Sequence, residues 1–205
     1  MKRASARIGR AAVPVILYLI VTAPVNAGEP TDQIRETVEK VLEIVKDPTL
    51  KSDAKSDERR IRLRDTIYSR FDFPEMAKRS LGSHWQRRTS QEQREFVEIF
   101  ADLLEGAYVD RIESYNGEKF LYVNETREKG YAEVRTRIVT REKKEYSIDY
   151  KLRPVDKEWK VYDVVIEDIS LVNNYRSQFS RVLAKSSYEE LLGRMKDKQF
   201  KAPKK

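Results

Sequence analysis

The sequence predicts an α+β fold, in which helices cover one face of a four-stranded antiparallel sheet. Two observations lead to this prediction. Apolar residues recur at helical spacing before residue 113 and again after residue 170, whereas they alternate with polar residues between residues 119 and 167. The links between the alternating segments are short and polar, which fits hairpins and leaves no room for a crossover helix. Helices, then strands, then helices is the order of an α+β domain.

The first 27 residues have the features of an export signal. Four cations precede a short apolar run at 11–21, and Val25-Asn26-Ala27 supplies small residues at which a signal peptidase cuts; the cations are Lys2, Arg3, Arg7 and Arg10. The run is well short of the roughly 20 residues that a permanent membrane anchor needs. We therefore expect a signal peptide over 1–27, one domain over 28–197 and a flexible basic tail over 198–205.

Charge and cysteine content narrow the classes of function. Removing 27 residues from 205 leaves 178 and takes away four positive charges, so the formal net charge of +7 becomes +3. So small an excess does not suggest a nucleic-acid-binding protein. The chain has no cysteine, which excludes disulfides, thiolate metal sites and cysteine nucleophiles.

Three helices are predicted before residue 86. The first is amphipathic and stops at Asp47-Pro48; its apolar face is formed by Ile34, Val38, Val41, Leu42 and Val45. The second follows a charged stretch at 51–60 and carries Ile61, Leu63, Ile67 and Tyr68. The third is short, covering 75–81, because Pro74 suits a first helical position and Gly82 suits a helix end.

The pattern of the fourth helix is the strongest in the chain. Thr89-Ser90-Gln91-Glu92 is a capping box, and Asn116-Gly117 breaks the pattern that follows it. The repeating apolar residues are Phe96, Phe100, Leu103, Leu104, Ala107, Tyr108 and Ile112.

Period-two alternation then predicts strands over 119–126, 132–138, 146–152 and 158–167, each with one face in water. From Ser170 the spacing is helical again, and Ser187 caps a last helix.

Candidate catalytic and metal-binding residues are few. His84 is the only histidine, so a zinc site would need carboxylates alone around it, and a hydrogen-bonded histidine at a helix end is the simpler interpretation. Ser83 beside it does not sit in a nucleophile elbow. Asp149 and Asp163 could form a carboxylate pair, but the strand register points Asp149 to water. No phosphate-binding glycine loop is present. We predict no catalytic residue, metal ligand or cofactor.

Four arginines lie close together at the start of the second helix: Arg59, Arg60, Arg62 and Arg64. They could meet anionic headgroups or an acidic partner, although such a run is more often a solvated helix face.

The remaining feature is a set of large apolar residues in a chain that is 37% charged. The set comprises Phe73, Met76, Leu81, Trp85, Phe96, Phe100, Leu104, Tyr108, Ile148, Tyr150, Leu152 and Trp159. Such residues either interdigitate as a filled core or hold two layers apart around a cavity. Composition alone favours the filled core.

Several motifs occur in a fixed order in FDFPEMAKRSLGSHW, in QEQREFVEIFADLLEGAY and in EWKVYDVVIEDISLVNNYRSQF. Together they resemble the MlaC family of periplasmic phospholipid-binding proteins, also called the toluene-tolerance family, and the resemblance runs from about residue 32 to 192. One departure is Asp168, where the family's I-E-G-x-S turn has glycine. An aspartate tolerates the left-handed region, so the fold is expected to survive.

The resemblance implies a carrier that encloses acyl chains in an apolar cavity and moves phospholipid between the outer and inner membranes, maintaining outer-membrane lipid asymmetry. It implies a periplasmic location, with an inner-membrane ATP-driven transporter complex and an outer-membrane lipoprotein complex as partners. We expect the protein to be a monomer. Given this resemblance, the cavity becomes the preferred interpretation, and the twelve large apolar residues become the candidate lipid-binding set. The residues expected nearest the tails are Trp85, Phe100, Tyr108, Ile148, Tyr150 and Trp159, with the headgroup at the mouth.

Two alternatives remain at this point. One is a non-catalytic interaction module with a filled core. The other is a small hydrolase or isomerase that uses an aspartate with His84.

Overall fold

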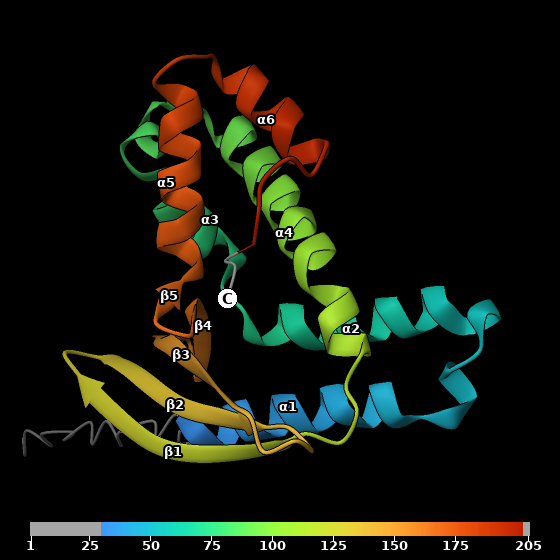
Figure 1. Cartoon of the computed structure of the whole chain (residues 1–205). Helices are drawn as coiled ribbons and strands as arrows, with labels where there is room; N and C mark the ends of the chain where they lie inside the picture. The colour runs from blue at the N-terminus through green and yellow to red at the C-terminus, as the bar shows by residue number, and fades with distance from the viewer. Residues whose placement is uncertain (1–29, 203–205) are drawn as a thin grey trace, which may run out of the picture.

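The computed structural model describes residues 30–202, which form six α-helices and one antiparallel sheet (Figure 1). The α+β class is confirmed. The helices are α1 (Pro30–Lys46), α2 (Ser56–Arg70), α3 (Phe73–Leu81), α4 (Ser90–Glu113), α5 (Leu171–Leu183) and α6 (Tyr188–Lys196). The strands are β1 (Lys119–Glu128), β2 (Tyr131–Val139), β3 (Glu145–Val155), β4 (Glu158–Ile166) and β5 (Ile169–Ser170), and the short 3₁₀ segments are η1 (Pro48–Leu50), η2 (Asp53–Lys55) and η3 (Gly82–Arg87).

The sheet has five strands in the order β1-β2-β3-β4-β5, so the prediction of four was wrong by one. The fifth strand is two residues long and pairs with the end of β4, where Ile169 lies opposite Ile166. Two residues cannot display an alternating pattern, so the sequence could not separate this strand from the start of α5. The connecting turn places both Glu167 (φ 48°) and Asp168 (φ 64°) in the left-handed region. Asp168 thus adopts the conformation that glycine would take more easily.

Side-chain caps fix where several helices begin. The capping box at the start of α4 is confirmed: the Glu92 amide donates to Thr89 Oγ1 at 3.2 Å, and the Thr89 amide donates to Glu92 Oε2 at 2.6 Å. Asp72 accepts from the Glu75 amide at 3.0 Å and starts α3. These bonds satisfy amides that have no partner within the helix.

The part of the β4 edge that β5 does not cover forms hydrogen bonds with groups from α1, α2 and the α2–α3 link. The Trp159 amide donates to Gln33 Oε1 at 2.9 Å, and the Trp159 carbonyl accepts from Arg70 Nη1 at 2.9 Å. Further along, the Val161 carbonyl accepts from the Asp72 amide at 2.7 Å. This pairing satisfies an edge that would otherwise expose bare backbone groups.

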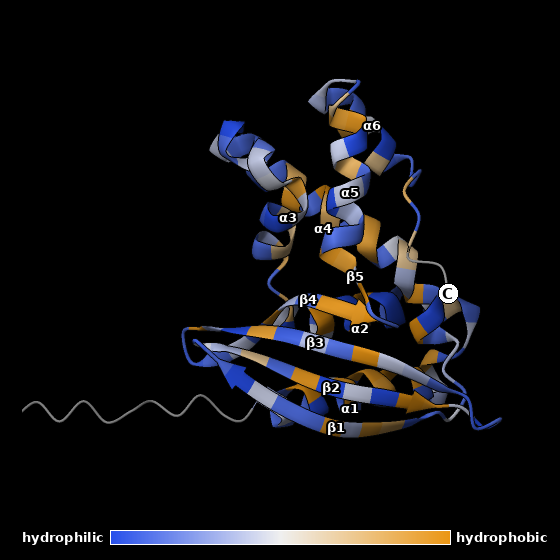
Figure 2. Ribbon diagram, turned by 60° about the vertical axis from the view of Figure 1, so that its left-hand side comes forward, coloured by the Kyte–Doolittle hydropathy of each residue, from blue (hydrophilic) through white to orange (hydrophobic). Residues whose placement is uncertain are grey.

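The apolar residues gather into two cores. One lies among α3, α4, α5 and α6, which form the helical lobe; its centre is an aromatic cluster of Phe96, Phe100, Tyr175 and Phe179. The other lies between the sheet and α1, which together with α2 form the sheet lobe; it includes Ile34, Val134, Leu152, Trp159 and Val161. Figure 2 shows the helical lobe standing above the sheet.

Part of the segment expected to be a flexible tail makes contacts in the structure. The Phe200 ring meets Phe179 edge to face, with centroids 5.0 Å apart, and the Lys201 amide donates to Gln178 Oε1 at 3.2 Å. The predicted signal peptide and residues 203–205 lie outside the described residues. Across 30–202, none of the helices combines the length and apolar character needed to cross a bilayer.

Candidate functional site

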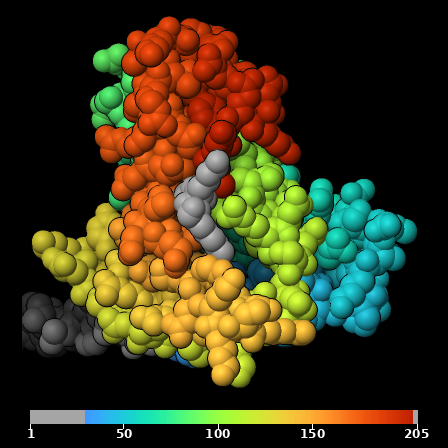
Figure 3. Space-filling model, viewed as in Figure 1, coloured from blue at the N-terminus to red at the C-terminus, as the bar shows by residue number. Residues whose placement is uncertain are grey.

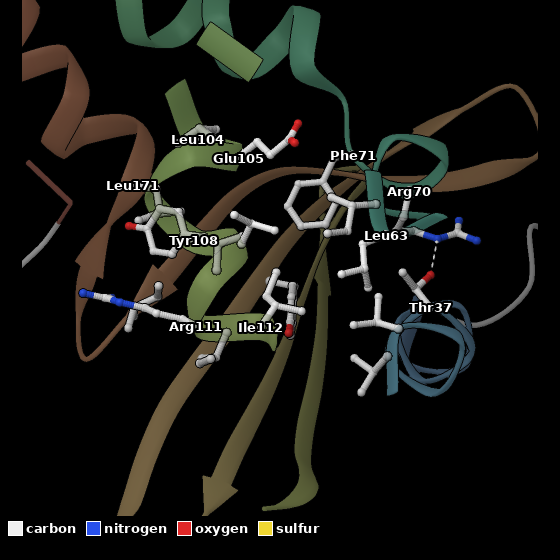
Figure 4. Close-up of a pocket in the computed structure, with 18 of the residues that line it drawn as sticks. Thr37, Leu63, Arg70, Phe71, Leu104, Glu105, Tyr108, Arg111, Ile112 and Leu171 are labelled. Carbon is white, nitrogen blue, oxygen red and sulfur yellow. Dashed lines mark hydrogen bonds between the residues drawn. The ribbon is translucent and has the colours of Figure 1, made fainter. Parts of the chain in front are cut away.

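A cavity of about 440 Å³ lies between the two lobes. Its walls come from α1, α2, the second half of α4 and the inner face of the sheet. Figure 3 shows the surface hollowed between α4 and the strands, and Figure 4 shows Tyr108 and Ile112 of α4 facing Leu63 and Phe71 across the space. The volume falls within the range of roughly 300–1,000 Å³ that is usual for ligand sites.

The sheet forms the wall of the cavity with only one end of its inner face. Toward the other end, Val134 and Leu152 are fully buried against α1. At the cavity end, inner-face residues of the same strands, including Ile138, Ile148 and Tyr150, are only half-buried. Large apolar side chains that point inward yet remain partly exposed indicate a hollow and not a filled core.

The long helix α4 belongs to both lobes. Its first half packs Phe96 and Phe100 into the helical core, where neither ring is exposed. Its second half extends past that core and presents Leu104, Tyr108 and Ile112 to the cavity. Opposite it, α1 and α2 contribute apolar residues at helical spacing, namely Val38, Val41, Leu42, Leu63 and Ile67.

Ion pairs, and not close packing, join α2 to α4 at the cavity's rim. Arg59 Nε lies 2.9 Å from Glu113 Oε1, and Arg64 Nε lies 2.6 Å from Glu105 Oε2. Arg60 reaches Asp110 at 3.5 Å on the same helix. The fourth arginine of the cluster, Arg62, pairs within α2 with Glu58 at 2.6 Å. The basic cluster is thus engaged within the chain, three of its members between helices.

Most of the cavity's polar lining groups are themselves bonded or uncharged, and the Arg111 guanidinium lies 5.6 Å from the centroid of the Tyr108 ring. Arg70 donates to Thr37 Oγ1 at 3.1 Å and to Gln33 Oε1 at 2.6 Å (the first bond is dashed in Figure 4). Burial raises the pKa of both Tyr108 and Tyr150 well above the ordinary phenol value, so both stay neutral at physiological pH. Such a surface suits hydrocarbon and disfavours charge.

The structure divides the twelve predicted site residues into two equal groups. Six line the cavity: Phe73, Met76, Leu104, Tyr108, Ile148 and Tyr150. Six lie outside its lining: Leu81, Trp85, Phe96 and Phe100 pack in or against the helical core, and Leu152 and Trp159 pack in the sheet core. Helical and strand periodicity identify the apolar face of an element, but not which part of that face meets a void.

Sequence reasoning left several lining residues out of the site, although it recognised their faces as apolar. They are Val38, Val41 and Leu42 of α1, Leu63 and Ile67 of α2, Phe71, and Phe120, Ile138, Tyr146, Val164 and Ile166 of the sheet. Apart from Phe71, which lies between α2 and α3, their common signal was a regular apolar face on a predicted helix or strand.

The candidate catalytic residues do not gather at the cavity. His84 lies in η3, in the helical lobe. Asp163 is buried and accepts from Ser170 Oγ at 2.6 Å and from the Val172 amide at 3.1 Å, which fixes the start of α5. Asp149 lies opposite Val165, and burial raises its pKa. Within 30–202, no group of three or more histidines and carboxylates is placed to hold a metal ion.

Comparison with known proteins connects this geometry to a family. A solved structure of a phospholipid-binding protein from Ralstonia solanacearum, in complex with a phospholipid, superposes with a TM-score of 0.76 at 22% identity, covering 83% of this chain and 97% of that one. At that identity the likeness establishes the fold. No curated protein matches the chain significantly. The family model described as MlaC protein matches residues 35–197, and the chain therefore belongs to the MlaC family.

Proposed function

We propose that this protein is a periplasmic phospholipid carrier. It holds acyl chains in the cavity between the lobes and carries lipid between the inner and outer membranes, which maintains the lipid asymmetry of the outer membrane. The observation that carries the proposal is the cavity: a hollow of about 440 Å³ walled by apolar side chains, where tight packing would otherwise be expected. Membership of the MlaC family and a fold shared with a phospholipid-binding protein support it.

The residues proposed to contact acyl chains are the six predicted residues in the lining, together with the apolar faces of α1 and α2. The six residues outside the lining act differently. They build the two cores that hold the walls apart, as the edge-to-face contact of Trp85 with Phe96 at 6.4 Å illustrates.

The energetics fit a carrier. Burying a methylene stabilises a complex by roughly 0.8 kcal/mol, so two chains of about 15 methylenes gain on the order of 24 kcal/mol relative to water. Lipid therefore does not escape into solvent. A bilayer offers nearly the same gain, so exchange is possible wherever the mouth of the cavity docks on a membrane or a membrane protein.

The docking partners we propose are an inner-membrane ATP-driven transporter complex and an outer-membrane lipoprotein complex, each meeting a monomer of this chain. Direction of transport then comes from the partners, because the carrier itself gains little on either side. Transfer of fluorescent phospholipid from loaded carrier to proteoliposomes that contain the transporter should exceed transfer to bare liposomes. Equal rates for the two would contradict this arrangement.

Native mass spectrometry of the purified protein tests the carrier proposal directly. We expect a mass excess equal to whole phospholipid molecules, which disappears on denaturation and is recovered in the organic extract. A protein at its bare mass that also takes up no lipid from phospholipid vesicles would instead be an interaction module. Conversion of bound lipid to products, lost in His84→Ala, would indicate the hydrolase alternative.

A further inference from the structure

A second, polar pocket adjoins one end of the cavity. Its volume is about 520 Å³, and it lies where α1 and α4 end, beside the α4–β1 loop and the β2–β3 turn. Tyr115 lines both this pocket and the apolar cavity. Each element around the polar pocket also continues into the wall of the cavity, as Lys46 follows Leu42 on α1 and Arg141 follows Thr140. Tyr115 is therefore part of the wall of both spaces.

The polar pocket, which we call the basic pocket, carries a positive excess. Four cations line it, Lys46, Lys51, Arg59 and Arg141, against a single carboxylate, Glu113. Glu113 is already engaged, because Arg59 Nε lies 2.9 Å and Arg60 Nε 4.0 Å from its Oε1. Among the described residues, no carboxylate forms an ion pair with the other three cations.

Neighbouring negative groups do not cancel this excess. The carboxyl ends of α1 and α4 contribute about half a negative charge each. Glu118, in the adjoining cavity wall, accepts from the Asn116 amide at 2.7 Å. Even with these counted, positive charge remains in the basic pocket, and cations gathered without an anion repel one another.

Local geometry holds two of the cations in place. Lys46 Nζ lies 5.1 Å from the centroid of the ring of Tyr115, the residue that lines both spaces. The Arg141 guanidinium lies against Gly117, where a Cβ atom would come within 3.1 Å of Nη2 and the backbone has a φ of +88°. Glycine therefore permits this close approach. An ammonium and a planar guanidinium that line one pocket from separate elements are both groups that bind phosphate.

We propose that the basic pocket binds a phosphate group through Lys46, Lys51 and Arg141. The phosphate is the phosphodiester of a lipid whose acyl chains occupy the cavity, because the basic pocket and the apolar cavity share Tyr115 in their walls and together match an amphiphile with an anionic head. This source of phosphate rests on the proposed function. Free inorganic phosphate has the same chemistry, and the experiment separates the two.

The experiment compares Lys46→Gln/Arg141→Gln with the control Arg181→Gln/Lys185→Gln, which removes two exposed cations near the end of α5. Each protein is incubated with vesicles that contain phosphatidylglycerol and diacylglycerol with identical acyl chains, and bound lipids are quantified by mass spectrometry. The pocket variant should lower the ratio of phosphatidylglycerol to diacylglycerol about tenfold while total loading persists. The control should match the wild-type protein. An unchanged ratio in the pocket variant would overturn the assignment to a lipid phosphate.

Titration with inorganic phosphate, followed by the NMR shift of the Gly117 amide, separates the sources. Lipid-free wild-type protein should show a saturable shift that the pocket variant lacks and that phosphatidylglycerol loading abolishes. A shift that persists in the loaded protein would assign the pocket to free phosphate and overturn the lipid source. An absent shift, with an unchanged lipid ratio, would overturn the site altogether. Failure of the carrier proposal is a distinct result, since wild-type protein would then load neither lipid.

Discussion

Ile148→Glu is the substitution that best separates a hydrocarbon-binding cavity from an ordinary surface depression. Ile148 lies in the middle of β3, opposite Thr136 of β2 and Ile166 of β4. Its carbonyl accepts from Thr136 Oγ1 at 2.6 Å, whereas its half-buried side chain lines the cavity. The backbone pairing does not depend on the side chain, and in lipid-free protein the introduced carboxylate faces water. We expect the fold to survive, with a loss of about 1–3 kcal/mol in the free energy of unfolding from the lost apolar burial.

The cost to lipid binding can be worked out from protonation. Against acyl chains the carboxylate has no partner, so binding is easiest when the group is neutral, and its pKa in the loaded state is raised. Protonating a group of ordinary pKa about 4.3 at pH 7 costs about 3.7 kcal/mol, at about 1.36 kcal/mol per pH unit. Lipid retention should therefore fall by up to about 500-fold at pH 7. Because the loaded state binds the extra proton, retention should recover about tenfold for each unit that the pH falls toward 5.

The assay is transfer of labelled phospholipid from loaded protein to acceptor vesicles at pH 7, 6 and 5, with folding checked by circular dichroism. Ile148→Gln should lose retention without this pH dependence. Val123→Glu is the matched control, because Val123 is an apolar residue of the sheet that is 55% exposed; it should behave as the wild-type protein. Ile148→Glu that retains lipid normally at pH 7, or equally at pH 7 and pH 5, would refute the claim that Ile148 faces acyl chains.

Three further predictions concern the framework of the cavity. Asp168→Gly should raise the free energy of unfolding in urea by about 0.5–1 kcal/mol, because glycine adopts the observed φ of 64° without strain. An unchanged free energy of unfolding would mean that Asp168 introduces no strain into the turn. The Tyr175 hydroxyl is buried without a partner among the described residues, and burial raises the pKa of Tyr175 to about 12, so Tyr175→Phe should not destabilise the protein at pH 7. From about pH 10 toward 12 the wild-type protein should lose about 1.4 kcal/mol more stability per pH unit than the variant, because Tyr175 ionises first in the unfolded chain; identical alkaline melts would contradict this. Arg70→Leu should cost about 2–4 kcal/mol in thermal or urea unfolding, since the buried Trp159 carbonyl loses its donor. Arg70→Lys should recover only part of this loss, since one ammonium cannot replace both the Nη1 bonds to Gln33 and Trp159 and the Nε bond to Thr37; full recovery would show that charge alone matters.

The local rules of the sequence located most of the elements. The capping box at Thr89 and the break at Asn116-Gly117 bracket α4, and the period-two segments coincide with β1 to β4. Such signals can be read because they depend on neighbours within a few residues: a cap satisfies amides three positions away, and alternation reflects one wet face. The prediction missed β5 for the same reason, since a two-residue strand has no period.

The cavity could not be located in this way. Phe100 and Tyr108 lie on one face of α4 at helical spacing, yet the first is fully buried in the helical core and the second lines the cavity. Leu152 and Ile148 lie on one face of β3, yet Leu152 is fully buried in the sheet core and Ile148 lines the cavity. The members of each pair differ in their position along the element. One lies where the opposing layer packs over it, and the other lies past the point where that layer ends.

The sequence by itself determined the α+β class, most helix and strand positions, and the apolar faces from which a lipid-binding interior could be built. Only the tertiary structure decided which stretches of those faces touch one another and which remain apart, and that Lys46, Lys51 and Arg141 come together beside the hollow. The physical reason is the range of the interactions involved. Periodicity and capping are set by interactions along one element, whereas a cavity and a cluster of like charges exist only where distant elements fail to close or are brought together.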